Sequence, residues 1–257
     1  MGTAWGIRSG VFVRCILTGR CAESCSAAGQ NGTGIARRGH ACGFLLDEES
    51  LKAKLHGSKL EIAAVNYPGL CVIAGASNDI ARFQQQLEDS NIFCKHLDTS
   101  HAFHSHMMEP MLPAFKKVID SIELHAPKIP IVSTVNGEWM SEDIAKSSDY
   151  WVGHVRHTVL FSHGFKTLMA DEHHDFVFLE VGPGRSLESS AKQHFSAEDG
   201  ALIYASLPTA KDVALSGEHL LSTLGALLGW WCRRSLASAS FRTAPSPHPA
   251  ARLSFRT

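Results

Sequence analysis

The chain has 257 residues, of which 44% are hydrophobic and 19% are charged. This balance is typical of a folded protein with a substantial core and excludes a largely disordered one. The formal net charge of -1 provides no electrostatic basis for binding nucleic acid or an anionic membrane surface, and no apolar run is long enough to cross a bilayer. The seven cysteines form no regular framework, so we expect reduced thiols in a cytoplasmic protein.

Residues 1–40 are rich in Gly, Ser, Arg and Cys and have no sustained periodicity. We expect a poorly defined segment that contains at most one short helix. Cys21 and Cys25 are spaced as C-x3-C, which alone is a weak metal signal. The first seventeen residues are basic and lack acidic residues, a faint resemblance to an organellar targeting segment. A disordered terminus is the favoured interpretation.

Residues 41–100 alternate between strand-like and helix-like patterns, and three apolar side chains, Ile80, Phe83 and Leu87, share one face of a predicted helix. Asn66, Pro68 and Gly69 are interpreted as turn residues. The predicted elements are a strand at 42–46, a helix starting at 47, strands at 60–65 and 70–74, a helix at 78–90 and a strand at 91–97. The order βαββαβ predicts a ferredoxin-like small subdomain.

Residues 101–232 continue the alternation of helices and strands, which predicts an α/β unit with a parallel sheet covered on both faces. The tail, 233–257, is rich in Ser, Ala, Arg and Pro, and we expect it to be disordered. The predicted elements are a helix at 107–122, a strand at 129–133, a helix at 161–171, a strand at 176–181, a helix starting at 185, a strand at 202–205 and a helix at 216–231.

The most informative stretch is Asp98-Thr-Ser-His-Ala-Phe-His-Ser-His-Met-Met108. It places His101 and His104 between a predicted strand and a predicted helix, where rigid neighbours could hold an imidazole still for general base catalysis. Two other interpretations are open at this point. The histidines could simply fill a polar loop, or they could join His106 in a metal site, although positions i, i+3 and i+5 do not converge easily on one face.

This stretch resembles the His-Ala-Phe-His segment of polyketide-synthase acyltransferase domains. The resemblance covers residues 43–208, and the further motifs occur in the order of the family. They are Ala63-Ala-Val-Asn-Tyr-Pro-Gly-Leu-Cys-Val-Ile-Ala-Gly75, Pro130-Ile-Val-Ser-Thr-Val-Asn-Gly137, Tyr150-Trp-Val-Gly-His-Val-Arg-His-Thr-Val-Leu-Phe161 and Phe178-Leu-Glu-Val-Gly-Pro-Gly-Arg-Ser-Leu187. The family inserts a ferredoxin-like subdomain into an α/β-hydrolase-like one. The expected fold is therefore an incomplete α/β-hydrolase-like acyltransferase subdomain with a βαββαβ small subdomain.

The resemblance implies transfer of a malonyl or related acyl group from coenzyme A to the phosphopantetheine thiol of an acyl carrier protein. In the family a serine in Gly-His-Ser-x-Gly attacks the thioester and a histidine accepts the serine proton; His104 corresponds to that base. His101, Ala102 and Phe103 correspond to the selectivity segment, whose His-Ala-Phe-His form goes with malonyl rather than methylmalonyl units. If Phe103 is instead a plain core residue, the acyl preference cannot be inferred.

Other roles also follow from the resemblance. Asn66 corresponds to a residue near the acyl site, with turn capping as an equal alternative. Independently of the resemblance, Gly182 and Gly184 flank Pro183 and let the backbone approach closely between a strand and a helix, where a tight supporting turn is favoured over a phosphate cradle. The segment 157–161 resembles one that offers a backbone oxygen to the catalytic ring. We expect no bound cofactor and no metal, and the partners implied are an acyl carrier protein and other polyketide or fatty acid synthase domains.

One departure is large, because no Gly-x-Ser-x-Gly occurs in the sequence. The stretch Gly39-His-Ala-Cys-Gly43 has only the outline, with Ala41 in place of serine. No secure match exists for the arginine that clamps the malonyl carboxylate, although Arg20 lies near its position. We therefore expect a truncated or inactive fragment, or one piece of a larger synthase. The alternative is a non-catalytic module that docks carrier proteins or synthase domains.

Overall fold

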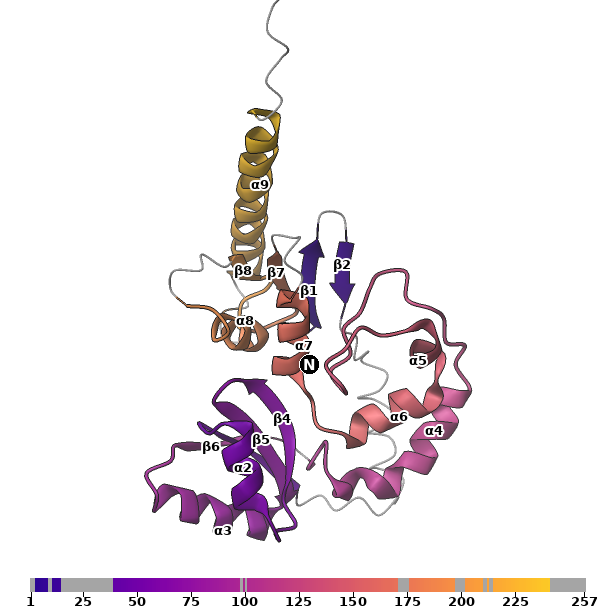
Figure 1. Ribbon diagram of the computed structural model, residues 1–257, viewed down its shortest axis with the longest axis vertical. Coiled ribbons are helices and arrows are strands. Elements are labelled where there is room, and N and C mark those ends of the chain that lie inside the picture. The colour runs from indigo at the N-terminus through magenta and orange to yellow at the C-terminus, as the bar shows by residue number, and fades with distance from the viewer. Residues whose placement is uncertain are drawn as a thin grey trace, which may run out of the picture.

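The computed structural model describes residues 3–8, 11–14, 39–97, 99, 101–170, 176–196, 202–209, 212 and 215–240. Within these residues the strands form two four-stranded sheets. One sheet lies in the lower part of Figure 1 and the other above it. Helix α7 (Phe161–Met169) lies between the two sheets and contacts strand β4 (Glu61–Tyr67) of the lower one.

The lower sheet has the predicted βαββαβ order. Its elements are β3 (Gly39–Phe44), α2 (Glu48–Leu55), β4, β5 (Leu70–Ala76), α3 (Ser77–Glu88) and β6 (Cys94–Leu97). The strand order is β4-β5-β3-β6, and every neighbouring pair is antiparallel. This is the arrangement of a ferredoxin-like unit, so the predicted element order is confirmed.

The two faces of this sheet have different partners. Both helices pack on one face, where Leu51 of α2 and the predicted stripe of α3 (Ile80, Phe83 and Leu87) share a buried cluster with Ile73. Residues on the opposite face contact Ala102 instead: Ala63, Val72 and Ala74. The histidine-rich segment therefore lies against the face that the helices leave uncovered.

Local signals explain where several elements begin. The Asp47 side chain accepts a hydrogen bond from Ser50 N and caps α2, as the acidic start predicts. The turn between β4 and β5 is formed by Pro68 and Gly69, with Gly69 at φ +96°. Asn66 was predicted to belong to this turn but lies within β4.

The upper sheet is less parallel than expected. It consists of β1 (Thr3–Arg8), β2 (Val11–Arg14), β7 (Val177–Val181) and β8 (Leu202–Ala205). The strand order is β2-β1-β7-β8, in which only β7 and β8 are parallel, while β1 is antiparallel to both neighbours.

The remaining elements are helical. They are the 3₁₀ helix η1 (His106–Met111), α4 (Leu112–Asp120), α5 (Glu142–Lys146), α6 (Ser148–Arg156), α8 (Ser186–Lys192) and α9 (Ser216–Ser240).

Several predictions for the two ends were wrong or lie outside the described residues. Part of the segment 1–40 forms β1 and β2 rather than a helix. Helix α9 starts where predicted but continues to residue 240, past the expected start of the disordered tail. The pair Cys21 and Cys25, Arg20 and residues 241–257 lie outside the described residues. The division of the chain into domains at 40, 100 and 232 otherwise stays a prediction.

Two internal elements also differ from the prediction. The single helix expected at 107–122 is divided into η1 and α4, because Pro110 and Pro113 lack the N–H that a continuous helix would use. The strand expected at 129–133 is reduced to one bridge between Val132 and Trp139. The predictions for α7, β7, α8 and β8 agree with the structure within a few residues.

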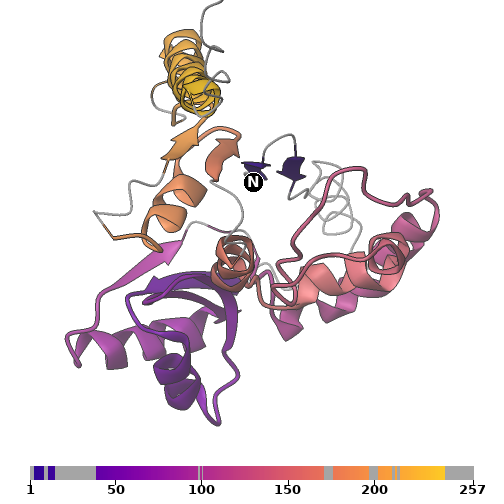
Figure 2. The ribbon, with the colours of Figure 1, turned by 45° about the horizontal axis from the view of Figure 1, so that its top comes forward.

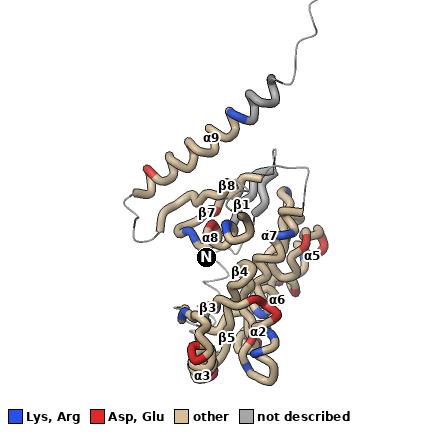
Figure 3. The backbone as a smooth tube through the Cα atoms, turned by 60° about the vertical axis from the view of Figure 1, so that its left-hand side comes forward, with Lys and Arg blue, Asp and Glu red and all other residues tan. Residues whose placement is uncertain are grey.

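Helix α9 extends away from the rest of the molecule (Figures 1 and 2). It is attached to β8 through Thr223, whose hydroxyl donates to Ala205 O at 2.8 Å. Leu221 and Trp231 on this helix are 70% and 56% exposed, and charged residues on it are few (Figure 3). Across the part of the chain that the structure describes, no helix combines the length and hydropathy needed to span a membrane.

Candidate active site around His104

His104 is held by the backbone at the C-terminal end of helix α6. Its Nδ1 lies 2.9 Å from His157 O, and its backbone N–H donates to Val155 O at 3.1 Å. A carbonyl oxygen can only accept, so Nδ1 carries the proton in the neutral ring and Nε2 carries the lone pair. The contact agrees with the backbone oxygen expected from segment 157–161. The ring is thus prepared to accept a proton at Nε2.

The backbone of His104 is strained. Its φ is +61°, in the left-handed region that costs a residue with a Cβ of the order of 1–3 kcal/mol. Next to it, the buried Ser105 hydroxyl donates to Ala102 O at 2.6 Å and accepts from Met107 N at 3.3 Å. The turn is therefore closed on itself and also fixed to α6, which is how such a conformation persists.

Burial sets the charge of this ring. Loss of solvent lowers the pKa of His104, and the hydrogen bond to His157 O opposes that effect in part. The ring is consequently neutral at physiological pH, which a general base requires.

Behind His104 lies a second, more deeply buried imidazole. The rings of His104 and His154 meet edge to face with centroids 6.4 Å apart, and His154 is 6% exposed. Its Nε2 is 3.1 Å from Thr134 Oγ1, whereas its Nδ1 has no hydrogen-bond partner among the described residues. Burial lowers the pKa of His154 to about 4. This ring stays neutral and supports the His104 ring without adding charge.

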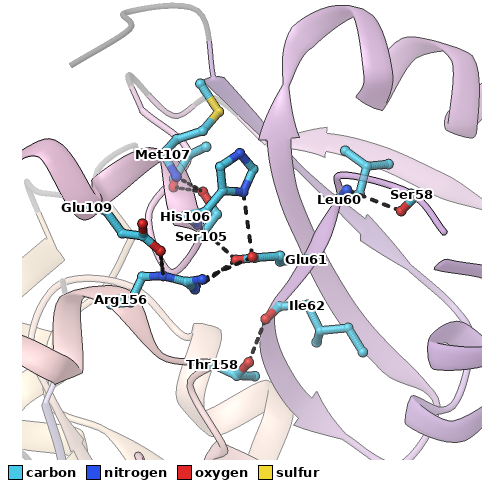
Figure 4. Close-up of polar contacts among 11 residues, drawn as sticks. Ser58, Leu60, Glu61, Ile62, Ser105, His106, Met107, Glu109, Arg156 and Thr158 are labelled. Atoms are coloured by element: carbon cyan, nitrogen blue, oxygen red, sulfur yellow. Dashed lines mark hydrogen bonds and ion pairs between the residues drawn. The ribbon is translucent and has the colours of Figure 1, made fainter. Parts of the chain in front are cut away.

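An ion-pair cluster joins this region to the ferredoxin-like sheet (Figure 4). Arg156 donates from both terminal nitrogens to Glu61 on β4, at 2.8 and 3.0 Å, and from Nε to Glu109 at 2.9 Å. Glu61 also accepts from His106 N at 2.9 Å. Beside it is a cavity of about 350 Å³, and the residues that line it are Lys52, Leu55, His56, Leu60, Glu61, Ile62, His104, Arg156, His157 and Thr158.

The residues predicted to select the acyl group lie directly before His104. Ala102 is 1% exposed and packs against the sheet, while Phe103 is half-buried and packs against the cluster formed by η1, α4 and α6. The rings of His101 and Phe103 meet at 5.9 Å. Because Phe103 has core neighbours, both interpretations of this side chain stay open, and the selectivity role remains a prediction.

The other predicted site residues are spread over two sheets. Asn66 is half-buried on β4, the strand that also carries Glu61. Gly182 and Gly184 form the turn between β7 and α8, where Gly184 has φ +103° and its N–H donates to Pro208 O at 3.0 Å. This geometry fits a tight strand–helix connection. The roles of these three residues stay predictions.

Two alternative sites find little support among the described residues. The stretch from Gly39 to Gly43 lies in the extended strand β3, where no nucleophile elbow could form. The three histidines have separate neighbours, because His104 binds His157 O, His106 faces Glu61 and His101 packs on Phe103. No group of three or more His, Cys, Asp or Glu side chains in the described part of the chain could hold a metal ion.

The structure also contains a buried serine–histidine pair. Ser162 Oγ is 2.9 Å from His194 Nε2, and His194 Nδ1 is 3.0 Å from Ser190 O. Ser162 is only 2% exposed, and the His194 ring packs against Phe165 at 4.8 Å. A thioester cannot reach this hydroxyl, so the pair contributes to the core rather than to acyl transfer.

Sequence reasoning missed Glu61, Arg156 and His154. Arg156 and His154 lie inside a motif that carried the family resemblance, yet nothing in the motif indicated a role for either. Glu61 lies at the start of a predicted strand and has no distinguishing signal. Its partner is 95 positions away, a separation that only the fold can bridge.

Comparison with known proteins agrees with this geometry. Residues 22–223 match the family described as "Acyl transferase domain". The chain belongs to this family. Among solved structures, the acyl transferase domain of SpnD in complex with 2-(pent-4-yn-1-yl)malonyl superposes with a TM-score of 0.69 at 29% identity, covering 79% of this chain and 48% of that one. The acyltransferase domain from the second module of the salinomycin polyketide synthase gives 0.68 at 26% identity, covering 86% and 52%.

Curated relatives of this acyl transferase domain are polyketide synthases. The phenolphthiocerol synthesis polyketide synthase type I Pks15/1 of Mycobacterium marinum is 37% identical over 145 residues, which are 55% of this chain and 7% of that protein. Polyketide synthase GfsA of Streptomyces halstedii is 34% identical over 169 residues, 65% of this chain and 2% of that protein. The chain thus spans a small part of these synthases and about half of the two solved domains, and its α/β fold is that of their acyltransferase domains.

Proposed function

We propose that this chain supplies the general base of an acyltransferase site that moves a malonyl group from coenzyme A to an acyl carrier protein. His104 is the base, and a serine outside these 257 residues is the nucleophile. Nε2 takes the serine proton as the serine attacks the thioester, and it returns that proton to the coenzyme A thiolate. The malonyl group then passes from the serine to the phosphopantetheine thiol of the carrier protein.

One observation carries the proposal: the hydrogen bond from His104 Nδ1 to His157 O, which leaves Nε2 unprotonated. A backbone carbonyl here has the place that a carboxylate has in a serine–histidine–aspartate triad, where it selects the tautomer. The lowered pKa of His104 adds support, because the ring remains a base at neutral pH. The malonyl preference rests on His101, Ala102 and Phe103 and on the resemblance of that segment to the family.

The proposal is tested by reconstitution. The chain is mixed with an acyltransferase fragment that carries Gly-His-Ser-x-Gly, and malonyl-coenzyme A and carrier protein are added. Malonylated carrier protein is measured by intact-protein mass spectrometry. We expect no transfer by the chain alone, because the sequence lacks the serine motif. The mixture is expected to transfer, and His104→Ala should lower its rate by about 100- to 10,000-fold.

His125→Ala is the matched control, because the side chain of His125 is 73% exposed and should be dispensable. The proposal would be contradicted if the mixture containing His104→Ala transferred malonyl as fast as the mixture containing the unmodified chain. Transfer by the chain alone would contradict it as well. Binding of carrier protein without transfer in any mixture would instead favour a non-catalytic docking module, which other synthase domains could also engage.

A further inference from the structure

We propose that Arg156, fixed between Glu61 and Glu109, is a positioning residue that holds the His104 ring in its base-competent orientation. This inference rests on the proposed function for its catalytic meaning, but its geometry stands independently. The guanidinium is engaged by the two carboxylates, so Arg156 acts on the His104 ring through its two neighbours in the chain.

The two residues that bind His104 flank Arg156 directly. Val155 O accepts from His104 N, and His157 O accepts from His104 Nδ1. A rotation of the backbone at residue 156 would shift these two acceptors relative to each other, so both could no longer meet His104. The orientation of the ring is therefore coupled to the conformation of Arg156.

Arg156 is the last residue of α6, where a helix ordinarily frays. Its guanidinium makes a bidentate pair with Glu61 and a third contact with Glu109, as Figure 4 shows. The Arg156 side chain is 25% exposed and that of Glu61 is 32% exposed, so both groups are partly shielded from water. A bidentate arginine–carboxylate pair fixes direction as well as distance, which a lysine could not reproduce.

The carboxylate partner is itself fixed from two sides. Glu61 is the first residue of β4, and its carboxylate accepts from His106 N, two residues beyond His104. The His106 ring also lies 3.5 Å from this carboxylate. The cluster thus fixes two segments that contact the base. One is the end of α6, which carries the two acceptors of His104, and the other is the start of η1, which follows His104 in the chain.

The strained backbone of His104 explains why such a clamp is useful. At φ +61° the residue would relax towards an ordinary conformation if its surroundings loosened. The hydrogen bond from Thr158 Oγ1 to Ile62 O, at 2.7 Å, and the bridge between Val159 and Ala64 also attach this segment to β4. Loss of Arg156 should therefore reorient the ring without unfolding the sheet.

The primary measurement is the protonation state of the His104 ring, followed by heteronuclear NMR of the full chain with ¹⁵N-labelled histidine. The variants are Arg156→Gln, Arg156→Lys and Glu61→Gln. We expect Nδ1–H to predominate in the unmodified chain. In Arg156→Gln and Glu61→Gln the two tautomers should mix, and the pKa of His104 should rise towards about 6.5 as the ring gains solvent. Arg156→Lys should restore only part of the signature.

Lys116→Gln is the matched control. Lys116 pairs with Asp149 of α6 at 2.6 Å, so this variant breaks an ion pair at the other end of that helix. It should leave the ring unchanged. An unchanged His104 tautomer and pKa in both Arg156→Gln and Glu61→Gln would overturn the proposal, as would an equal change in Lys116→Gln. If Arg156→Gln fails to fold, Glu61→Gln alone decides.

The reconstituted reaction separates this proposal from the proposed function. If both hold, Arg156→Gln lowers kcat by up to about 100-fold, as expected when a catalytic group is misplaced by about 1 Å, with less effect on KM. If the NMR signature changes as expected but transfer never depends on His104, Arg156 positions the ring and the proposed function is wrong. If the ring is unaffected while His104-dependent transfer persists, the proposed function stands and Arg156 has no positioning role.

Discussion

Replacement of the buried His154 by glutamine tests how this core responds to acid. His154 is 6% exposed, and within the part of the chain that the structure describes its Nδ1 has no hydrogen-bond partner. A glutamine amide can still reach Thr134, which is 3.1 Å from Nε2, but it cannot titrate. The variant therefore removes one protonation equilibrium while it keeps a polar contact.

The expected magnitude follows from the pKa. Burial lowers the pKa of His154 from 6.5 to about 4 in the folded protein, so between these values the unfolded chain binds the proton more tightly. The contribution of the neutral His154 ring to the unfolding free energy is therefore fully present above pH 6.5, and it is lost as the pH falls towards 4. When the pH is lowered from 7.5 to 4.5, the titration of this single ring should decrease the unfolding free energy by about 2.5 kcal/mol.

Urea denaturation at the two pH values measures the effect. The fall in unfolding free energy between pH 7.5 and pH 4.5 should be about 2.5 kcal/mol smaller in His154→Gln than in the unmodified protein. His125→Gln is the control, since that side chain is 73% exposed. The reasoning would be refuted if His154→Gln kept the full pH dependence, or if His125→Gln removed as much of it.

Two further predictions concern stability at neutral pH and are checked by the same denaturation assay. Leu87→Ala should decrease the unfolding free energy by about 2–5 kcal/mol because Leu87 is 2% exposed. The control Leu221→Ala, at a site 70% exposed, should change it by less than about 0.5 kcal/mol. Similar losses in the two variants would mean that α3 does not pack as described. Gly184→Ala should cost at least about 1 kcal/mol because φ is +103° although space is open. Gly217→Ala in α9, where space is also open, should instead stabilise by about 0.5–1 kcal/mol, and effects of the same sign would count against backbone strain at Gly184.

Much of the local structure could be predicted from the order of residues. The spacing of Ile80, Phe83 and Leu87 predicts the buried face of α3, and the acidic Asp47 predicts the start of α2. These signals act within one or two turns of a helix, so the sequence carries them directly. The βαββαβ order followed from the same kind of local evidence, and the motif around His104 indicated the family.

Local patterns failed where neighbours compete. The apolar periodicity after His106 predicted one helix, but Pro110 and Pro113 divide it. The segment 129–133 has the residues of a strand but only one bridge, because the propensity for β structure depends on the partner that is available. Strand β1 was missed for the converse reason. Its own sequence does not indicate a strand, and the segment is extended because it pairs with β7.

The order of residues was enough to identify the elements of the small subdomain, the likeness to acyltransferases and the candidate base, since each element and each motif is a short run of neighbouring residues. How that base is held depends instead on the folded arrangement. The His157 carbonyl is 53 positions from His104, and Arg156 is 95 positions from Glu61. Contacts over such separations arise when whole elements pack, so their partners and directions are properties of the folded chain.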